Sequence, residues 1–275
     1  MAKQPVKWFL GAGAALAGLW AFMTVPGKAV SEKKIPFYGR YFAHRGLHTG
    51  DGIVPENSLA AFLRAESFGY GIELDLQLTR DPEVVVFHDD SLKRMCGIDK
   101  ALKDLTWAEL RDLRLLGSEE KIPRFADVLS SLNGSAPLIV ELKRGENNAA
   151  LCEKTLELMR AYPGDCCVES FDPTIVRWWK KHAPDVLRGQ LSADRGSFDK
   201  ETFAPLAFGM ARLLFNFAGR PQFIAYRISE RRPFALRICT WMGAMPVAWT
   251  SRAPGDEDGN DAVIFEGYYP PKQYK

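Results

Sequence analysis

The chain has little cysteine and no large excess of charge of either sign. Its five cysteines are an odd number without metal-site spacing, and we expect Cys166 and Cys167 to be buried as small apolar residues. This usage favours a reducing compartment. The formal net charge is +2, but five lysines and one glutamate lie within residues 1–36, so the rest of the chain carries −2. That balance predicts no basic surface for a nucleic-acid partner.

An uncharged run of eighteen residues extends from Trp8 to Val25. It is long enough for a bilayer core, which takes roughly 17–25 residues, and its three glycines are commoner in membrane helices than in soluble ones. A signal peptide usually has a shorter apolar region and a small-residue cleavage site, unlike the exit at 26–28. We therefore expect residues 1–36 to be a retained membrane anchor and linker. A cleaved signal peptide and a helix packed on the domain are the alternatives.

The flanking charges leave the orientation of this anchor open. Lys3 and Lys7 precede the run, whereas Lys28, Lys33 and other basic residues follow it. The positive-inside rule counts Lys and Arg near the span, so the count favours a cytoplasmic domain. A short N-terminus with two lysines favours the opposite orientation, with the N-terminus in the cytoplasm.

From residue 37 to 275, strand-like and helix-like segments alternate, and the length suits one α/β barrel of about 250 residues. This alternation predicts parallel βαβ units closed into a TIM (β/α)8 barrel, with a doubly wound open sheet as the alternative. The expected strands are Tyr41–Arg45, Gly71–Leu78, Pro137–Lys143, Cys166–Phe171, Val186–Ser192, Phe223–Ile228, Pro246–Thr250 and Ala262–Glu266.

Two segments interrupt the alternation. A charged, leucine-containing stretch at about 90–121 follows the short strand-like run Val84–Phe87, which predicts a small insertion after the second strand. The acidic, glycine-rich stretch Ser251–Asp261 is too short for an ordinary outer helix, so we expect a thin barrel wall there.

Four polar clusters lie at the ends of apolar runs. They are His44-Arg45-Gly46, Glu73-Leu74-Asp75, His88-Asp89 and Glu141-Leu142-Lys143. Charge at the end of a buried strand costs free energy unless it is paired or binds something, and barrel active sites form at the carboxyl ends of the strands. One such cluster alone is more often a salt bridge or a solvated face. Four together favour a site.

Three carboxylates in these clusters suit a hard cation. Side chains two apart on a strand share a face, so Glu73 projects with Asp75, and Glu141 with Lys143. Such a set predicts Mg²⁺ or Ca²⁺ as cofactor, with a substrate phosphate completing the shell. Lys143 would offset charge on a phosphate oxygen.

Two histidines in the clusters come from different strand ends. His44 and His88 could exchange protons on opposite sides of a scissile bond, because histidine titrates near neutrality. Arg45 could bind the phosphate in bidentate fashion. We interpret His48 as a loop residue and His182 as an exposed helix end.

Together these residues resemble the glycerophosphodiester phosphodiesterase family over about residues 38–270. The motifs are AHRG at 43–46, PENS at 55–58, GIELDLQLTRD at 71–81, VVFHDDSL at 85–92 and VELK at 140–143, with looser matches in ESFDP at 169–173, FIAYR at 223–227 and AWT at 248–250. The resemblance implies a TIM barrel that hydrolyses a phosphodiester to an alcohol and glycerol phosphate with a divalent cation.

The resemblance also implies roles for individual residues. By motif, these are Glu73, Asp75 and Glu141 as metal ligands, His44 and His88 as the acid/base pair, and Arg45 and Lys143 as phosphate ligands. Glu56 would order the first loop, with a secondary chance of contacting metal or substrate. The family usually continues AWT with valine and asparagine, whereas this chain has Ser251-Arg252, which puts a substrate-facing role of Trp249 in doubt.

The predicted function is a membrane-tethered, metal-dependent phosphodiesterase for glycerophosphodiesters or lysophospholipids. One alternative is a phosphodiesterase on the same barrel in which a substrate hydroxyl attacks the phosphorus and a cyclic phosphate forms. Another is a membrane-anchored binding module without catalysis. The sequence leaves the alcohol, the choice of cation and the oligomeric state open.

Overall fold

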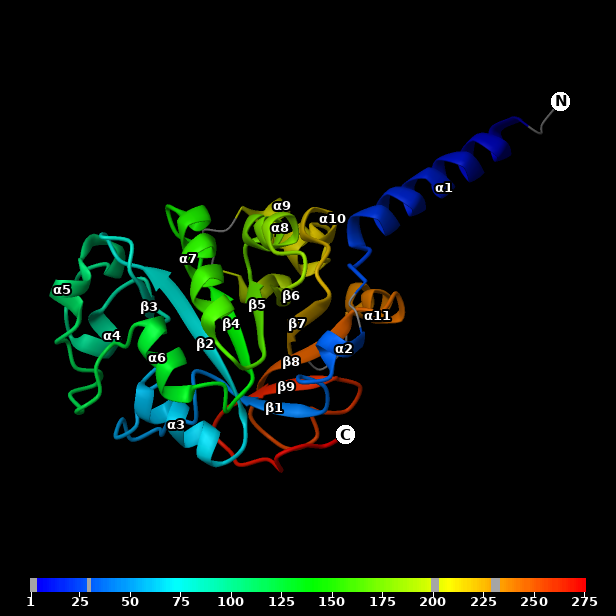
Figure 1. Cartoon of the computed structure of the whole chain (residues 1–275). Helices are drawn as coiled ribbons and strands as arrows, with labels where there is room; N and C mark the ends of the chain where they lie inside the picture. The colour runs from blue at the N-terminus through cyan, green and yellow to red at the C-terminus, as the bar shows by residue number, and fades with distance from the viewer. Residues whose placement is uncertain (1–3, 29–30, 199–202, 229–232) are drawn as a thin grey trace.

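A parallel barrel forms the centre of the molecule (Figure 1). The computed structural model describes residues 4–28, 31–198, 203–228 and 233–275. The strands in this part are β1 (Arg40–Ala43), β2 (Gly71–Leu78), β3 (Val84–Val86), β4 (Leu138–Leu142), β5 (Cys166–Ser170), β6 (Leu187–Ser192), β7 (Phe223–Arg227), β8 (Met245–Ser251) and β9 (Ala262–Phe265). Within the described residues, the parallel strands follow the order β1-β9-β8-β7-β6-β5-β4-β2, and β1 also pairs with β2. This closure rules out an open sheet and confirms the predicted eight-stranded barrel.

Helices connect the strands along the outside of the barrel (Figure 1). They are α1 (Gln4–Thr24), α2 (Ser31–Lys34), α3 (Leu59–Ser67), α4 (Lys93–Cys96), η1 (Leu102–Asp104), α5 (Trp107–Leu110), α6 (Phe125–Leu132), α7 (Asn148–Ala161), α8 (Pro173–His182), η2 (Arg195–Ser197), α9 (Ala204–Ala211), α10 (Asn216–Gly219) and α11 (Phe234–Trp241). Two of them begin at side-chain caps: Ser58 accepts from the Ala61 amide, and Asp172 accepts from the Thr174 amide. The stretch from Phe203 to Phe217 is not one continuous helix, because it contains α9 and the start of α10.

Apolar side chains pack on both faces of the barrel strands, inside the barrel and between the strands and the outer helices. The interior cluster includes Phe42, Ile139, Leu191, Phe223 and Ile264. A larger cluster outside joins β2 and β4 to α3, α6, α7 and α8. Alternation of the side chains along each strand produces these two layers.

The segment between β2 and β4 forms a lobe beside the barrel (Figure 1). β3 runs antiparallel to β2, and α4, η1 and α5 follow it. A separate apolar cluster that includes Phe87, Leu92, Leu102 and Leu110 stabilises this lobe. It lies next to the carboxyl end of β2, so its residues can reach the barrel mouth.

Helix α1 extends away from the barrel, and only its carboxyl end contacts the rest of the chain (Figure 1). Among the residues that the structure describes, no helix is long and apolar enough to cross a membrane. The predicted membrane-spanning helix over residues 8–25 therefore has no support from the structure.

Gly189 on β6 allows a close contact inside the barrel. A Cβ atom at this position would overlap the ring of Phe223 on β7, whereas Gly50 on the surface has open space around it. We expect Gly189→Ala to lower the free energy of unfolding by about 1–3 kcal/mol, the usual cost of overpacking. Urea denaturation would measure the change.

Gly50→Ala is the matched control for this substitution. Its Cβ would meet no other atom within 4 Å, so we expect an unfolding midpoint close to that of the wild type. Equal midpoints for the two variants would contradict the packing of β6 against β7.

Candidate active site

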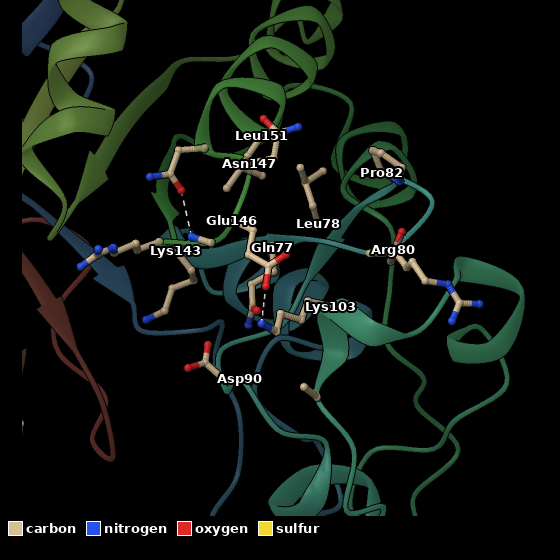
Figure 2. A pocket seen from close by; sticks show the side chains of 15 residues that line it. Gln77, Leu78, Arg80, Pro82, Asp90, Lys103, Lys143, Glu146, Asn147 and Leu151 are labelled. Atoms are coloured by element: carbon tan, nitrogen blue, oxygen red, sulfur yellow. Dashed lines mark hydrogen bonds and ion pairs between the residues drawn. The ribbon is translucent and has the colours of Figure 1, made fainter. Parts of the chain in front are cut away.

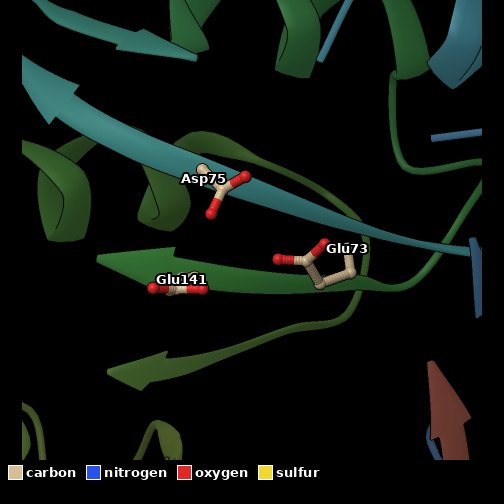
Figure 3. A group of neighbouring side chains, drawn as sticks. All are labelled: Glu73, Asp75 and Glu141. Atoms are coloured by element: carbon tan, nitrogen blue, oxygen red, sulfur yellow. The ribbon is translucent and has the colours of Figure 1, made fainter. Parts of the chain in front are cut away.

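Three buried carboxylates meet on the neighbouring strands β2 and β4 (Figure 3). Glu73 and Asp75 lie on β2, and Asp75 is the register partner of Glu141 on β4. One oxygen from each carboxylate lies within 4.8 Å of the others. The structure thus brings together the three residues that the sequence predicts as metal ligands.

The charges around this triad are only partly balanced. Lys143 Nζ lies 2.9 Å from Glu141 Oε1 and 3.5 Å from Asp75 Oδ1. Burial raises the pKa of Glu73 well above its ordinary value, and the neighbouring carboxylates Asp75 and Glu141 raise it further. Burial also acts to raise the pKa of Asp75, but Lys143 and Arg45 outweigh it and the pKa falls. A buried set of hard oxygen donors with unbalanced negative charge fits a divalent cation such as Mg²⁺ or Ca²⁺.

Arg45 contacts the triad through both its backbone and its side chain. Its φ of 54° places it in the left-handed region, and its amide donates to Glu73 Oε2 at 2.9 Å. The guanidinium lies 3.3 Å from Asp75 and donates to Glu56 Oε1 at 2.7 Å. Asn57 also donates to Asp75, at 2.8 Å. The AHRG and PENS motifs therefore order the first loop against the carboxylates.

His44 lies on the Glu73 side of the triad and is oriented by a second carboxylate. Its Nδ1 donates to Glu266 Oε2 at 3.0 Å, and its Nε2 lies 4.0 Å from Glu73 Oε2. The hydrogen bond from His44 lowers the pKa of Glu266 to about 2. Glu266 was not among the predicted site residues, although a charged residue at the end of the last predicted strand is a signal.

His88 lies within the influence of the charge of Asp75 and has its own carboxylate partner. Its Nδ1 donates to Asp89 Oδ1 at 2.8 Å. Burial lowers the pKa of His88, although the charge of Asp75 acts to raise it. Both histidines therefore use Nδ1 for a carboxylate and leave Nε2 available.

Arg94, on α4 of the inserted lobe, joins these groups. Its Nε donates to Asp89 Oδ2 at 2.6 Å, and its Nη1 donates to Glu56 Oε2 at 2.9 Å. Glu56 therefore bridges Arg45 and Arg94, which agrees with the predicted ordering role. Arg94 was missed because nothing in the sequence shows that an exposed helix of the insertion reaches back to the barrel mouth.

Glu169 on β5 is a fourth buried carboxylate that was not predicted as a site residue. It is the register partner of Glu141, and burial raises its pKa well above the ordinary value. Its Oε2 has no hydrogen-bond partner. Its position in the loosely matching ESFDP motif could have marked it as a candidate site residue from the sequence.

Trp249, on β8, occupies the aromatic side of the mouth. Its indole donates to the carbonyl of Ala225 at 3.1 Å, and its ring packs edge-on against Phe171 at 5.5 Å. Within the described part of the chain, its hydrogen bond and its ring contact go to Ala225 and Phe171 and not to the carboxylate triad, so the structure does not bring it together with the other predicted residues.

A polar cavity of about 480 Å³ adjoins the site at Lys143 (Figure 2). It lies between the inserted lobe and the loop after β4, and charged residues such as Asp90 and Arg144 line it. Lys103 of the lobe and Glu146 of the loop form an ion pair at its edge, with 2.5 Å between Nζ and Oε1. The cavity is therefore open space next to Lys143, which itself contacts two carboxylates of the triad.

Cation binding to the triad predicts a change in stability. Without a cation, the buried charge of Glu73 destabilises the fold, so Mg²⁺ or Ca²⁺ should raise the melting temperature at neutral pH. Ligand at a hundredfold excess over its Kd adds about 2.7 kcal/mol. E73Q should be more stable than the cation-free wild type and should respond weakly to cations in scanning calorimetry.

The raised pKa of Glu73 fixes the sign of the accompanying pH dependence. A carboxyl group with a raised folded-state pKa stabilises the fold while protonated, so cation-free wild type should lose stability as pH rises above the ordinary glutamate range. E73Q should lose less stability over the same rise in pH, because its side chain does not ionise. E153Q, on the exposed face of α7, is the control and should behave like the wild type. A wild-type melting temperature unaffected by both cations would contradict the site.

Comparisons with known proteins agree with this geometry. The sequence model of the "Glycerophosphoryl diester phosphodiesterase family" matches residues 44–202, more than half of the chain. The chain is 31% identical over 163 residues to "Lysophospholipase D GDPD1" of Rattus norvegicus, covering 54% of this chain and 50% of that protein. It is 34% identical over 156 residues to "Glycerophosphodiester phosphodiesterase" of Caldanaerobacter subterraneus, covering 52% and 64%. The chain thus spans about half the length of the first curated relatives it matches.

Solved structures share the fold at lower sequence identity. A phosphodiesterase of Oleispira antarctica, solved in complex with the product sn-glycerol-3-phosphate, has a TM-score of 0.67 and 22% identity, with coverage of 83% of this chain and 93% of that one. A glycerophosphodiester phosphodiesterase of Parabacteroides distasonis has a TM-score of 0.64 and the same identity and coverage. At this identity the likeness shows the barrel fold alone. Because the family's sequence model covers most of the barrel and the motifs that form its mouth, the chain belongs to the glycerophosphoryl diester phosphodiesterase family.

Proposed function

We propose that this protein is a metal-dependent phosphodiesterase that hydrolyses glycerophosphodiesters or lysophospholipids. The products would be an alcohol and glycerol 3-phosphate, or an alcohol and lysophosphatidate. The observation that carries the proposal is the buried carboxylate triad together with two carboxylate-oriented histidines, one near Glu73 and one near Asp75. The names of the curated relatives, a lysophospholipase D and a glycerophosphodiester phosphodiesterase, support this substrate class.

Glu73, Asp75 and Glu141 would hold the Mg²⁺ or Ca²⁺ ion. When bound, such an ion supplies a positive charge that polarises a phosphoryl oxygen. Arg45 and Lys143 flank the triad and would bind the remaining phosphate oxygens. The side chains of Arg45 and Lys143 both contact Asp75, so a bound phosphate would share these two cationic side chains with that carboxylate.

His44 and His88 would move the protons of the reaction. Each ring directs Nδ1 to a carboxylate, which leaves Nε2 as the atom that exchanges a proton with water or with the leaving oxygen. Glu266 and Asp89 would keep the rings in this orientation. The polar cavity beside Lys143 would receive the alcohol.

The proposal predicts the effect of removing either the cation or a histidine. Glycerophosphocholine and lysophosphatidylcholine should be hydrolysed with Mg²⁺ or Ca²⁺ and not with EDTA. His44→Ala should lower kcat by about 10²- to 10⁴-fold, the usual contribution of a general acid or base. Release of the alcohol under steady-state conditions would measure both effects.

His182→Ala is the control, because His182 ends the exposed face of α8, and it should keep wild-type activity. Product analysis by ³¹P NMR should show glycerol 3-phosphate or lysophosphatidate. Full activity in EDTA or in His44→Ala would overturn the mechanism, and a cyclic phosphate product would show attack by a substrate hydroxyl instead of water.

The contact between Glu266 and His44 leads to a second prediction, which concerns the kcat of Glu266 variants. Glu266→Ala leaves Nδ1 of His44 without its 3.0 Å acceptor, so the ring can rotate or change tautomer. We expect kcat to fall about tenfold or more with a smaller change in KM, and Glu266→Gln, which keeps an acceptor oxygen, to lose less. Asp258→Asn, exposed in the preceding turn, should leave kcat unchanged. Equal rates for Glu266→Ala and the wild type would remove Glu266 from the site.

A further inference from the structure

Large apolar side chains are exposed where α1 meets α10 and α11. Trp241 is 83% exposed and Phe234 is 62% exposed, both on α11. The set, called the apolar face below, consists of Leu16, Leu19, Phe22, Phe217, Phe234 and Trp241. Clustered exposed apolar residues of this size are characteristic of a binding surface rather than of ordinary solvent-exposed helices.

The apolar face belongs to one surface because the end of α1 is fixed on the barrel. Asn216 donates to the carbonyl of Thr24 at 3.0 Å, and Arg220 donates to the carbonyl of Phe22 at 2.8 Å. The ring of Phe22 stacks on Phe217 at 6.0 Å. Trp20 of α1 stacks in the same way on Phe234 of α11, at 5.8 Å. Figure 1 shows the end of α1 beside α10 and α11.

The segments that carry the apolar face are cationic in sequence. Residues 1–31 contain three lysines and no acidic residue, and residues 203–245 contain six arginines and one acidic residue, Glu230. Since the whole chain carries +2, the remaining residues carry −6. Lys28 and Arg237 are exposed next to the apolar side chains. The positive charge is therefore concentrated on the segments with the exposed aromatic residues.

We propose that the apolar face binds the surface of an anionic lipid bilayer. Exposed aromatic and aliphatic side chains between cationic ones match the boundary between acyl chains and anionic headgroups. A second copy of this chain would bring the same positive charges together, which disfavours self-association through this surface. The contact is with a bilayer surface and needs no spanning helix.

The apolar face extends along the outside of the barrel. α11 follows β7 and precedes β8, so Phe234 lies toward the carboxyl ends of the strands and Trp241 toward their amino ends. Binding through this face would hold the protein, and with it the active site, at the lipid surface. The consequence for lysophospholipid turnover rests on the proposed function. The binding itself does not, because it can be measured without turnover.

Co-sedimentation of the full chain with vesicles tests the proposal. The wild type should bind phosphatidylcholine vesicles that contain phosphatidylglycerol, bind pure phosphatidylcholine vesicles less, and dissociate as salt screens the headgroups. Phe234→Glu combined with Trp241→Glu should reduce the vesicle partition coefficient about tenfold or more, because two exposed aromatic side chains no longer enter the interface. Both positions are exposed, so circular dichroism should match the wild type.

Ile53→Glu combined with Leu63→Glu is the matched control, because both residues are exposed and lie away from α1, α10 and α11. It should bind vesicles like the wild type. Undiminished binding of the α11 double variant would overturn the proposal and leave α1 alone as the lipid contact. A lipid-free dimer by light scattering that the α11 variant abolishes would overturn it in favour of self-association.

Discussion

Mutual repulsion among Glu73, Asp75 and Glu141 is the constraint on which the rest of the site depends. Two unit charges 4 Å apart interact by about 4 kcal/mol at an effective dielectric constant of 20, so three buried carboxylates are stable only with nearby positive charge. Lys143 and Arg45 supply part of it, from the residue after β4 and from the loop after β1. Burial and the remaining imbalance of charge raise the pKa of Glu73, and both favour the divalent cation that we propose for this site.

The unbalanced negative charge of the triad also explains how the first loop and the inserted lobe are arranged. Arg45 is held in a left-handed conformation by the contact of its amide with Glu73, and its side chain is shared between Asp75 and Glu56. Glu56 in turn accepts from Arg94 of the lobe, which also orients Asp89 beside His88. The lobe therefore contributes to the site, because its Arg94 guanidinium orients Asp89, the hydrogen-bond partner of His88.

The proposed chemistry and the proposed lipid contact use different parts of the molecule. The carboxylates and histidines come from the rigid strand ends, whose positions follow from the closed barrel. The apolar face comes from helices outside the barrel wall and from the end of α1, in segments that also carry an excess of cationic residues. This separation allows the site to keep its geometry whether or not the protein is on a lipid surface.

The barrel and the composition of its mouth can be predicted without coordinates. Eight apolar runs spaced by helical segments are a local pattern, and polar residues at their ends are visible without coordinates, so His44, Glu73, Asp75, His88, Glu141 and Lys143 were identified from it. Only the tertiary structure decided the partners of these residues. Glu266 is 222 positions from His44 and meets it because β9 closes the ring beside β1, and Arg94 meets Glu56 because the lobe folds back over the mouth. Spacing along the chain carries no information about such contacts, which depend on closure of the barrel and on packing of the insertion.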